Sequence, residues 1–181
     1  QAGEGTPRQL TKGNKTWISG VKWSPDGSRI LFEDKRMRLF DIDVRSGVKI
    51  EVDRGEHSSG ISAAEYSHDG TWIAYIKQDV NFFGSVYLHN VLSRRTERVT
   101  DGRYHEYDVT WDPEARWLYF ASKRSFEPIS SAFEARMVHR VTDHIYAIRL
   151  TDDEAEPVPV LSDEEVDDDG DPIIIESDGE K

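Results

Sequence analysis

One short sequence pattern occurs three times in this chain at nearly constant spacing. It reads Val-Lys-Trp-Ser-Pro-Asp-Gly, then Ala-Glu-Tyr-Ser-His-Asp-Gly, and then Val-Thr-Trp-Asp-Pro-Glu-Ala. The aromatic residues Trp23, Tyr66 and Trp111, which we call the anchors, are 43 and 45 residues apart. A fixed period of roughly 40–45 residues is typical of arrays built from one repeated structural unit. The pattern therefore predicts three similar units.

Each anchor is followed by residues that favour a tight turn, and an apolar triplet begins seven residues after it. Proline presets φ for such a turn and glycine supplies a positive φ, so each unit is predicted to open with a β-hairpin. Because the first strand of each unit should pack against its neighbour, Trp23 and Trp111 are both predicted to be buried. The residues of the structural repeat are Trp23, Asp26, Gly27, Tyr66, Asp69, Gly70, Trp111 and Pro113.

Two more strands are predicted in each unit, from short segments rich in β-branched and aromatic residues. The predicted third strands are residues 37–42, 85–89 and 144–150, and the predicted fourth strands are residues 48–52, 96–100 and 157–161. Four short strands in about 45 residues, without helical periodicity, are typical of a propeller blade. The predicted fold class is all-β: a partial β-propeller of about three four-stranded blades, with an orphan strand at each end.

The two ends of the chain carry the predicted orphan strands, at residues 5–11 and in the isolated apolar run 173–175. Because a propeller closes with typically four to eight blades, three blades predict a piece of a larger protein. The alternative is a half-propeller that closes by self-association about a twofold axis. The predicted division is 1–12 as the last strand of a preceding blade, 13–55 as blade 1, 56–102 as blade 2, 103–161 as blade 3 with a long insertion at 123–143, and 162–181 as an acidic connector with the start of the next element.

The net charge of −12 arises from one end of the chain. Residues 152–181 contain 14 of the 35 acidic residues and one of the 23 basic residues, so residues 1–151 are nearly neutral. Proteins that bind nucleic acid concentrate Lys and Arg on one face, whereas these basic residues are scattered among carboxylates. No apolar run approaches the ~20 residues that a membrane span needs. The predicted partners therefore include no nucleic acid and no membrane.

The sequence contains no recognisable catalytic pattern and only a weak metal-binding one. It has no cysteine, no Gly-x-Ser-x-Gly elbow and no metal-ligand spacing among its six histidines, so no catalytic residue and no cofactor are predicted. One acidic pattern is similar to an EF-hand loop, but neither flank looks helical, and a solvated connector is the favoured interpretation. The residues of this weak calcium pattern are Glu165, Asp167, Asp169 and Glu176.

Two loops carry aromatic and arginine residues of the kind that is enriched in contact surfaces. The insertion of the third unit is longer than the ~15 residues usual for a loop without a function. It either contacts a partner or packs across the neighbouring blade. The two adjacent phenylalanines of the second unit need cover from that insertion or from a partner, and cover from within the chain is the favoured interpretation. The predicted contact residues are Phe82, Phe83, Arg124, Phe126, Phe133, Arg136 and Arg140.

The repeat resembles that of a known group of propellers. Trp-Ser-Pro-Asp-Gly followed by an apolar triplet is similar to the repeat of TolB-type and tricorn-type propellers. The third unit has Trp-Asp-Pro from Trp111, Leu-Tyr-Phe-Ala-Ser from Leu118, a long insertion, His-Ile-Tyr-Ala-Ile-Arg-Leu from His144 and an acidic connector. This arrangement resembles, more specifically, the propeller of tricorn-like serine peptidases.

The resemblance implies a function and a set of partners. It implies a non-catalytic propeller segment of a tricorn-like serine peptidase, which gates or guides peptide substrates toward a catalytic region not present in this chain. The implied partners are a peptide or protein, the rest of the parent chain and, for a homo-oligomer, a second copy. The alternative is a TolB-like protein-binding module with no peptidase attached. Both interpretations rest on fold analogy. The compartment stays open, with the cytoplasm favoured over the periplasm.

Overall fold

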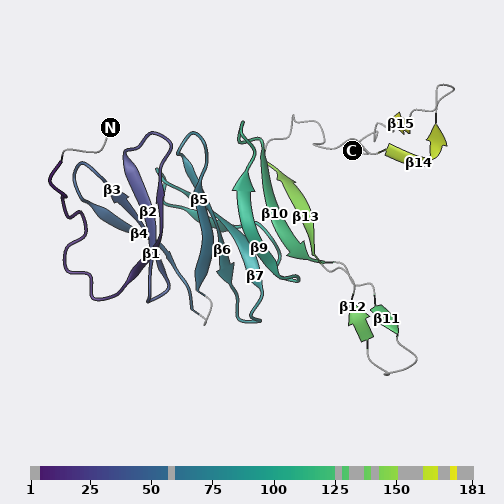
Figure 1. The fold of residues 1–181 in the computed structure, drawn as a ribbon, viewed down its shortest axis with the longest axis horizontal. Helices are drawn as coiled ribbons and strands as arrows, with labels where there is room; N and C mark the ends of the chain where they lie inside the picture. Colours follow the sequence, from purple (N-terminus) through teal and green to yellow (C-terminus); the bar gives the residue numbers. More distant parts are fainter. Residues whose placement is uncertain are drawn as a thin grey trace. The chain divides into compact units, whose positions relative to one another are not determined.

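The computed structural model describes residues 5–56, 60–124, 128–130, 137–139, 143–150, 161–166 and 172–174, and these residues contain β-strands and no helix. The chain divides into two compact units, Gln1–Leu150 and Thr151–Lys181. Figure 1 shows the first unit as a succession of twisted antiparallel sheets. The predicted all-β class is confirmed.

Three sheets, which we call blades 1, 2 and 3, follow one another in the first unit. Blade 1 contains, in spatial order, β1 (Ile18–Trp23), β2 (Arg29–Asp34), β3 (Arg38–Asp43) and β4 (Lys49–Arg54). Blade 2 contains β5 (Ile61–Tyr66), β6 (Trp72–Gln78), β7 (Gly84–Asn90) and β8 (Thr96–Arg98). Blade 3 contains β9 (Glu106–Trp111), β10 (Trp117–Lys123) and β13 (Asp143–Arg149), with β10 in the middle. Each chain segment pairs with the next, which is the meander of a propeller blade.

The insertion of blade 3 contains a small hairpin, where the sequence predicted only a loop. β11 (Pro128–Ser130) pairs antiparallel with β12 (Met137–His139). The predicted fourth strand of blade 3 falls largely outside the described residues, because only its last residue, Leu161, is described. Leu161 begins a different strand, β14 (Leu161–Val166).

The second unit corrects the prediction of an unpaired strand near the end of the chain. β14 pairs antiparallel with β15 (Pro172–Ile174), so the apolar run near the end of the chain has a partner within the chain. Asp163, Glu164 and Glu165 of the predicted acidic connector belong to β14. Five residues separate the two strands, which is a length that commonly closes an antiparallel pair.

The turn between β1 and β2 is held by its own polar side chains. The Ser24 hydroxyl donates to Asp26 Oδ1 at 2.6 Å, and its oxygen accepts the N–H of Arg29 at 2.9 Å. Gly27 has φ +68°, a conformation that side chains with a Cβ adopt only with strain. Hydrogen bonds from the side chains of Ser24 and Ser28 lower the pKa of Asp26 to about 2. The serine of this pattern therefore has a local, structural partner.

The turn between β5 and β6 repeats this arrangement. The Ser67 hydroxyl donates to Asp69 Oδ1 at 2.5 Å, and Gly70 has φ +70°. In blade 3 the turn has Asp112 in the serine position and Ala115 at the glycine position, where Ala115 keeps φ +55°. The third turn thus retains the backbone path of the other two without its glycine.

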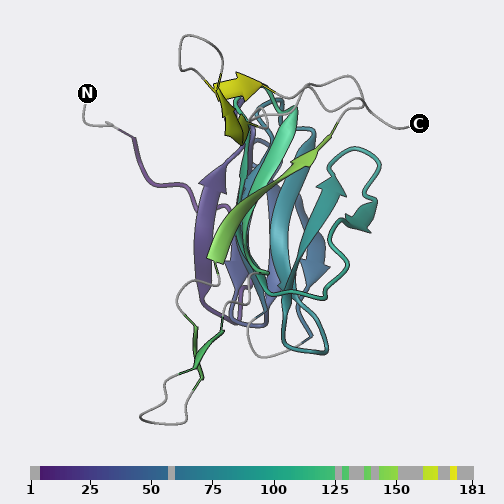
Figure 2. The same ribbon diagram turned by 90° about the vertical axis from the view of Figure 1, so that its right-hand side faces the viewer.

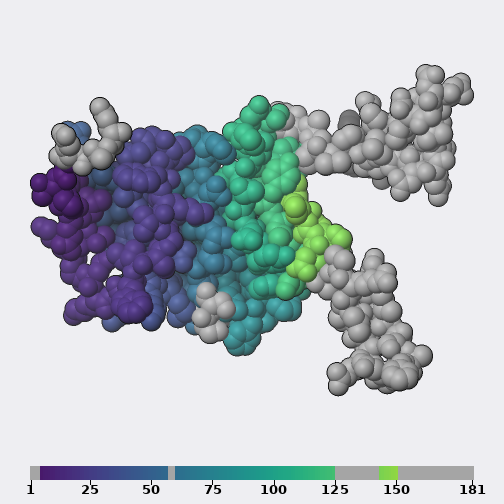
Figure 3. Space-filling view, viewed as in Figure 1, coloured from purple at the N-terminus to yellow at the C-terminus, as the bar shows by residue number. Residues whose placement is uncertain are grey.

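The blades pack face to face through apolar side chains. Figure 2 shows their strands overlapping in similar orientation, and Figure 3 shows the blades as successive bands of colour from purple to green. Between blades 1 and 2, the core is made of Leu31, Leu39, Val52, Ile61, Ala64, Tyr66, Ile73 and Tyr75. Between blades 2 and 3, it is made of Ala74, Ile76, Val86, Val109, Trp111, Leu118 and Phe120. Burial of these faces supplies the main stabilising free energy of such a stack.

The anchors Trp111 and Trp23 differ in burial, and the prediction for Trp23 was wrong. Trp111 is 6% exposed and packs against blade 2, as predicted, whereas Trp23 is 58% exposed. All six residues of β1 are exposed. The physical reason is the position of β1, because Tyr66 and Trp111 each face a preceding blade, while no described blade precedes β1.

The N-terminal segment lies against the outer face of blade 1. Leu10 packs on the cluster of Phe32, Phe40 and Ile42, whose side chains point away from blade 2. Residues 5–12 form no strand in the structure. Assignment of this segment to the last strand of a preceding blade therefore stays a prediction.

Candidate functional site

The two ends of the blades carry different sets of loops. Because the strands alternate in direction, the Ser-Asp turns lie at one end, and the loops that enter β7 and β9 lie at the other. In the loops that enter β7 and β9, four apolar side chains are exposed, with exposed fractions of 77%, 61%, 40% and 39% for Val80, Phe82, Phe83 and Tyr104. We define the rim surface as Val80, Phe82, Phe83, Tyr104 and Arg124.

The loop that carries Phe82 is held by a set of hydrogen bonds. The N–H of Phe82 donates to the carbonyl of Asp79 at 2.9 Å, and the N–H of Asp79 donates to the carbonyl of Phe83 at 2.8 Å. Asn81 accepts the N–H of Phe83 at 3.0 Å and donates through Nδ2 to the carbonyl of Gly102 at 2.9 Å. This loop is therefore fixed both within itself and to the next loop along the chain.

Phe82 has a positive φ, as do five other described non-glycine residues, among them Met37 in the corresponding turn of blade 1. The φ of Phe82 is +65°, in the left-handed region that a bulky side chain rarely adopts. Such a conformation costs on the order of 1–3 kcal/mol and is concentrated at contact and switch sites. Since 61% of the Phe82 side chain is exposed, burial within the described chain does little to offset this cost. The loop thus holds an apolar ring outward at an energetic cost.

The carboxylate of Asp79 fixes the base of the Phe82 loop through hydrogen bonds to residues of β7 and β8. This carboxylate accepts hydrogen bonds from Ser85 at 2.5 Å, Tyr87 at 3.0 Å and Arg98 at 2.5 Å. Burial, together with the hydrogen bond to Asp79, raises the pKa of Tyr87 to about 12. The phenol therefore stays protonated and keeps donating to Asp79 throughout the physiological range.

The loop that enters β9 connects Phe83 to Arg124. His105 Nδ1 accepts the N–H of Gly84 at 3.0 Å, and the His105 ring stands edge-on to Phe83 with centroids 6.2 Å apart. On the same loop, Tyr104 lies under the guanidinium of Arg124 at 5.2 Å. His105 therefore links the Phe83 loop to the loop of Tyr104, which contacts Arg124 directly.

Arg124 has partners inside blade 3. Its guanidinium donates to Glu106 Oε1 at 2.9 Å, and Glu106 is fully buried. It also lies over the stacked rings of Phe120 and Tyr146, at 5.3 Å and 4.5 Å. Most of its charge is therefore compensated within the blade, and its role in contacts stays a prediction.

The remaining predicted site residues fall largely outside the described residues. Among the predicted contact residues these are Phe126, Phe133, Arg136 and Arg140. In the weak calcium pattern, Glu165 belongs to β14, and Asp167, Asp169 and Glu176 are outside the described residues. Among the residues with described placement, no group of three or more His, Asp or Glu side chains could hold a metal ion. No helix among them is long and apolar enough to cross a membrane.

Each blade contains a stacked aromatic pair that the sequence analysis missed. Phe32 stacks on Phe40, Tyr75 on Tyr87 and Phe120 on Tyr146, with centroids 5.3, 5.7 and 6.0 Å apart. In each pair the two residues are direct cross-strand partners, which favours such contacts. The signal was present in the sequence, because the first member always stands nine residues after the anchor. This pair is a further element of the structural repeat.

A buried polar cluster between blades 1 and 2 was also missed. Asp41 is 3% exposed and accepts two bonds from Arg29 Nε, at 2.8 and 2.7 Å. Tyr66 of blade 2 donates to Asp41 Oδ1 at 2.8 Å, and burial followed by the charge of Asp41 raises the pKa of Tyr66. The available signal was that Tyr66 is the only anchor with a hydroxyl group.

His89, at the same interface, makes a pH-dependent contribution to the free energy of unfolding. It is buried, with Nδ1 2.8 Å from Thr96 Oγ1, and burial lowers its pKa below the usual 6.5. The charges of Asp41 and Asp53 oppose this shift, and Arg94 adds to it. Because the unfolded state binds the proton more readily, this contribution is fully present above about pH 6.5 and is lost as the pH falls through the folded pKa.

We therefore expect His89→Gln to reduce the acid sensitivity of the fold. Urea unfolding measured at about pH 7.5 and about pH 5.5 should show a smaller loss of stability in the variant than in the unmodified chain. Subtracting the pH-dependent loss of stability of the variant from that of the unmodified chain removes the contribution of the carboxylates that both proteins share. Equal losses would show that His89 does not contribute to the pH dependence.

Comparison with known proteins gives the family. A family model described as the Tricorn protease second beta propeller domain matches residues 1–178. Tricorn protease homolog 1 of Streptomyces coelicolor is 27% identical over 148 residues, covering 81% of this chain and 14% of that protein. The chain spans 13% and 14% of the length of two curated relatives that it matches.

Solved structures agree on the fold. The tricorn protease crystal structure matches with a TM-score of 0.74 at 18% identity, covering 81% of this chain and 15% of that one. A putative TolB from Agrobacterium tumefaciens matches with a TM-score of 0.53 at 22% identity, covering 81% of this chain and 50% of that one. Because the family model spans nearly the whole sequence, this chain belongs to the family of the tricorn protease second β-propeller domain.

Proposed function

We propose that this chain is a non-catalytic propeller segment of a tricorn-like serine peptidase, which guides peptide substrates toward a catalytic region outside the chain. We assign the peptide contact to the rim surface. The observation that carries this assignment is Phe82, an exposed aromatic residue held at φ +65° by a hydrogen-bonded loop. Exposed aromatic side chains on a fixed backbone bind partners with little loss of conformational entropy.

Two lines of support favour the peptidase context. The chain belongs to a propeller family named after a protease, and it spans a small part of relatives that carry the same name. The sequence contains no nucleophile and base in a recognisable arrangement, which supports a role in handling the substrate. Turnover of a fluorogenic peptide by the purified chain, blocked by a serine-directed inhibitor, would overturn the non-catalytic role.

The second candidate function is a TolB-like module that binds a protein and has no peptidase attached. The TolB match supports it, because that similarity covers as much of this chain as the tricorn match does. Because both functions would use the rim surface for contact, the two are distinguished by the kind of ligand that binds there. A peptidase segment should bind unfolded peptides of varied sequence, whereas a binding module should prefer one folded partner.

The Phe82→Gly variant tests the rim surface without damaging the fold. Glycine accepts φ +65° without strain, and the lost side chain is mostly exposed, so the free energy of unfolding should change by less than about 1 kcal/mol. Loss of an aromatic contact should weaken the binding of a labelled unfolded peptide by about 5- to 30-fold. Fluorescence anisotropy measures the affinity, and urea unfolding checks the fold.

Leu92→Gly is the matched control for this experiment. Leu92 is 83% exposed and lies in the turn between β7 and β8, at the opposite end of blade 2. Its removal also takes away a large exposed apolar side chain, but peptide affinity should stay unchanged. Equal losses in both variants would mean that the peptide binds exposed apolar groups without regard to the rim surface, and an unchanged Phe82→Gly variant would refute the assignment.

A further inference from the structure

Arg124 is held in one position by partners on the blade 2 side of blade 3. Its Nε donates to Ser122 Oγ at 3.0 Å, and its Nη2 donates to Glu106 Oε1 at 2.9 Å. The guanidinium also lies against three aromatic rings, at 4.5 to 5.3 Å from their centroids. These contacts leave the side chain few alternative conformations.

Part of this fixed guanidinium is available to a ligand. A guanidinium has five N–H donors, and the two bonds above use one donor each. Within the described part of the chain no hydrogen bond uses the remaining donors, and 29% of the Arg124 side chain is exposed. Arg124 therefore offers donors at the rim surface, and their use costs little conformational entropy.

Glu106 balances the charge of Arg124 from inside the blade. It is fully buried, and its second oxygen, Oε2, has no hydrogen-bond partner among the described residues. In the other two blades the residue five positions before the anchor is an isoleucine, Ile18 or Ile61. A buried carboxylate with an unpaired oxygen is less stable there than an apolar side chain. Such a costly departure from the repeat is expected where a residue serves a function.

The pair lies beside the Phe82 loop. Gly84, at the end of that loop, approaches Glu106 so closely that a Cβ on Gly84 would lie 2.2 Å from the carbonyl oxygen of Glu106. The N–H of Lys123 donates to the carbonyl of His105 at 3.1 Å, which fixes the end of β10 to the loop that enters β9. An extended peptide advances about 3.3 Å per residue, so a few residues can contact both this loop and the guanidinium.

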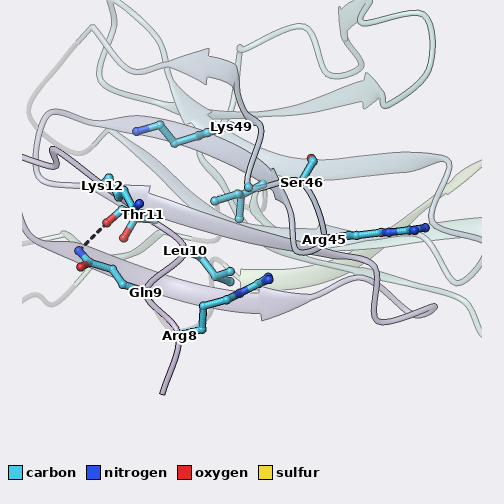
Figure 4. A pocket seen from close by; sticks show the side chains of 10 residues that line it. Arg8, Gln9, Leu10, Thr11, Lys12, Arg45, Ser46 and Lys49 are labelled. Carbon is cyan, nitrogen blue, oxygen red and sulfur yellow. Dashed lines mark hydrogen bonds between the residues drawn. The ribbon is translucent and has the colours of Figure 1, made fainter. Parts of the chain in front are cut away.

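The face of blade 3 that carries Arg124 is covered within the chain. Phe120 and Tyr146, on which the guanidinium lies, belong to the packing between blades 2 and 3. The pocket of about 460 Å³ in Figure 4 differs, because residues 8–12 and the turn between β3 and β4 line it on the outer face of blade 1. A preceding blade would cover that pocket, whereas the surroundings of Arg124 do not depend on a further blade.

We propose that Arg124 donates hydrogen bonds to main-chain carbonyl groups of the peptide at the rim surface, and that Glu106 is the positioning residue that orients the guanidinium and balances its charge. This inference rests on the proposed function and names the part of the ligand that is recognised. A guanidinium without a carboxylate partner would favour acidic side chains, whereas one paired with a buried carboxylate keeps its donors and little net charge. Because every residue of a peptide has a main-chain carbonyl, such a contact accepts varied sequences.

The test uses the full chain and two labelled decapeptides with acetylated and amidated ends. One contains phenylalanine, serine and glutamine, and the other has glutamate in place of each glutamine. The double variant Glu106→Ile/Arg124→Met removes the ion pair, introduces the isoleucine of the other blades and keeps an unbranched side chain over the rings. The matched control, Arg95→Met/Glu97→Gln, removes an ion pair of blade 2 whose side chains are 78% and 67% exposed.

We expect the double variant to lose about 5- to 30-fold in affinity for both peptides, and the control to lose less than about twofold. Fluorescence anisotropy measures the affinities, and urea unfolding checks that the variants are folded. A loss confined to the glutamate peptide would show that Arg124 recognises carboxylates. Unchanged affinity for both peptides would show that Arg124 makes no contact, and either result would overturn the proposal.

Glu106→Gln tests the charge balance and keeps an acceptor for the Nη2 donor of Arg124. It should leave the affinity for the glutamine peptide within about threefold and raise that for the glutamate peptide about 3- to 10-fold, by a gain that added salt removes. Glu97→Gln makes the same change in net charge at an exposed pair, and its gain should be less than about twofold. Equal gains in the two variants, or no gain in Glu106→Gln, would overturn the role of Glu106.

The Phe82→Gly variant separates a failure of this inference from a failure of the proposed function. If Phe82→Gly weakens peptide binding and Glu106→Ile/Arg124→Met does not, the rim surface binds peptide without the help of Arg124, and only the inference fails. If neither variant weakens binding, the assignment of peptide contact to the rim surface fails as well.

Discussion

Replacement of Trp111 by alanine should destabilise the blade stack by about 4 kcal/mol, whereas the same replacement at Trp23 should cost less than about 1 kcal/mol. Trp111 is 6% exposed within the core between blades 2 and 3, and its indole N–H reaches the carbonyl of Glu65 at 3.4 Å. Trp23 occupies the same position of the repeat but is 58% exposed. The large difference follows from burial alone, because the residue type and the sequence context are shared.

Urea unfolding followed by circular dichroism measures both variants, since loss of the sheet signal does not depend on which tryptophan is removed. The midpoint should fall strongly for Trp111→Ala and little for Trp23→Ala, at an unchanged slope. A Trp23→Ala variant as unstable as Trp111→Ala would mean that β1 is covered in solution. A Trp111→Ala variant as stable as the unmodified chain would contradict the packing of blade 3 on blade 2.

Replacement of Asp41 by alanine should cost about 3 kcal/mol. The change leaves the buried hydroxyl of Tyr66 without its acceptor and removes the carboxylate that Arg29 binds across the sheet. Breaking a buried ion pair from one side is costly because the remaining charge loses its compensation. Urea unfolding at neutral pH provides the measurement, and a loss below about 1 kcal/mol would show that the cluster is solvated.

Two comparisons make this prediction sharper. Glu97→Ala removes a carboxylate that is 67% exposed and 3.6 Å from Arg95, so it should change stability by less than about 1 kcal/mol. The equivalent position to Asp41 in blade 2 is Leu88, which packs in the same apolar cluster as Trp111. We expect the double variant Asp41→Leu/Tyr66→Trp to recover part of the stability lost in Asp41→Ala, because it reproduces the apolar Leu88–Trp111 packing found between blades 2 and 3.

The sequence was sufficient to predict the blades because the information that forms them is local. The turn residues, the anchor and the apolar triplet lie within about ten residues of one another, so each hairpin can be recognised by itself. The third strands also followed from local composition, and the structure places them within one or two residues of the prediction.

Features that depend on neighbours could not be predicted in the same way. The repeat gives Trp23 and Trp111 the same sequence context, but burial requires a preceding blade, which β1 lacks among the described residues. Asp41 alternates with apolar residues like any surface residue of a half-exposed strand, and only the hydroxyl of Tyr66 across the interface makes it part of a core. The position of a residue within the repeat therefore does not fix its energetic role.

The rim surface was predicted in part. The adjacent aromatic residues Phe82 and Phe83 indicated a contact loop from composition, but cover from within the chain was the favoured interpretation, whereas the described residues leave both of them exposed. The positive φ of Phe82 belongs to a local turn, because Met37 has the same conformation and the same turn hydrogen bond in blade 1. The sequence could not show the hydrogen bond from Asn81 to Gly102, which fixes this loop to the loop that enters β9.

The most direct test of the proposed function is amide hydrogen exchange of the full chain with and without a saturating unfolded peptide, resolved along the sequence. We expect slower exchange in residues 79–84 and 102–105 when peptide is bound, and unchanged exchange in the Ser-Asp turns at residues 24–28 and 67–71. Slower exchange confined to those turns, or no change at the Phe82 loop while the peptide is demonstrably bound, would contradict the assignment of peptide contact to the rim surface.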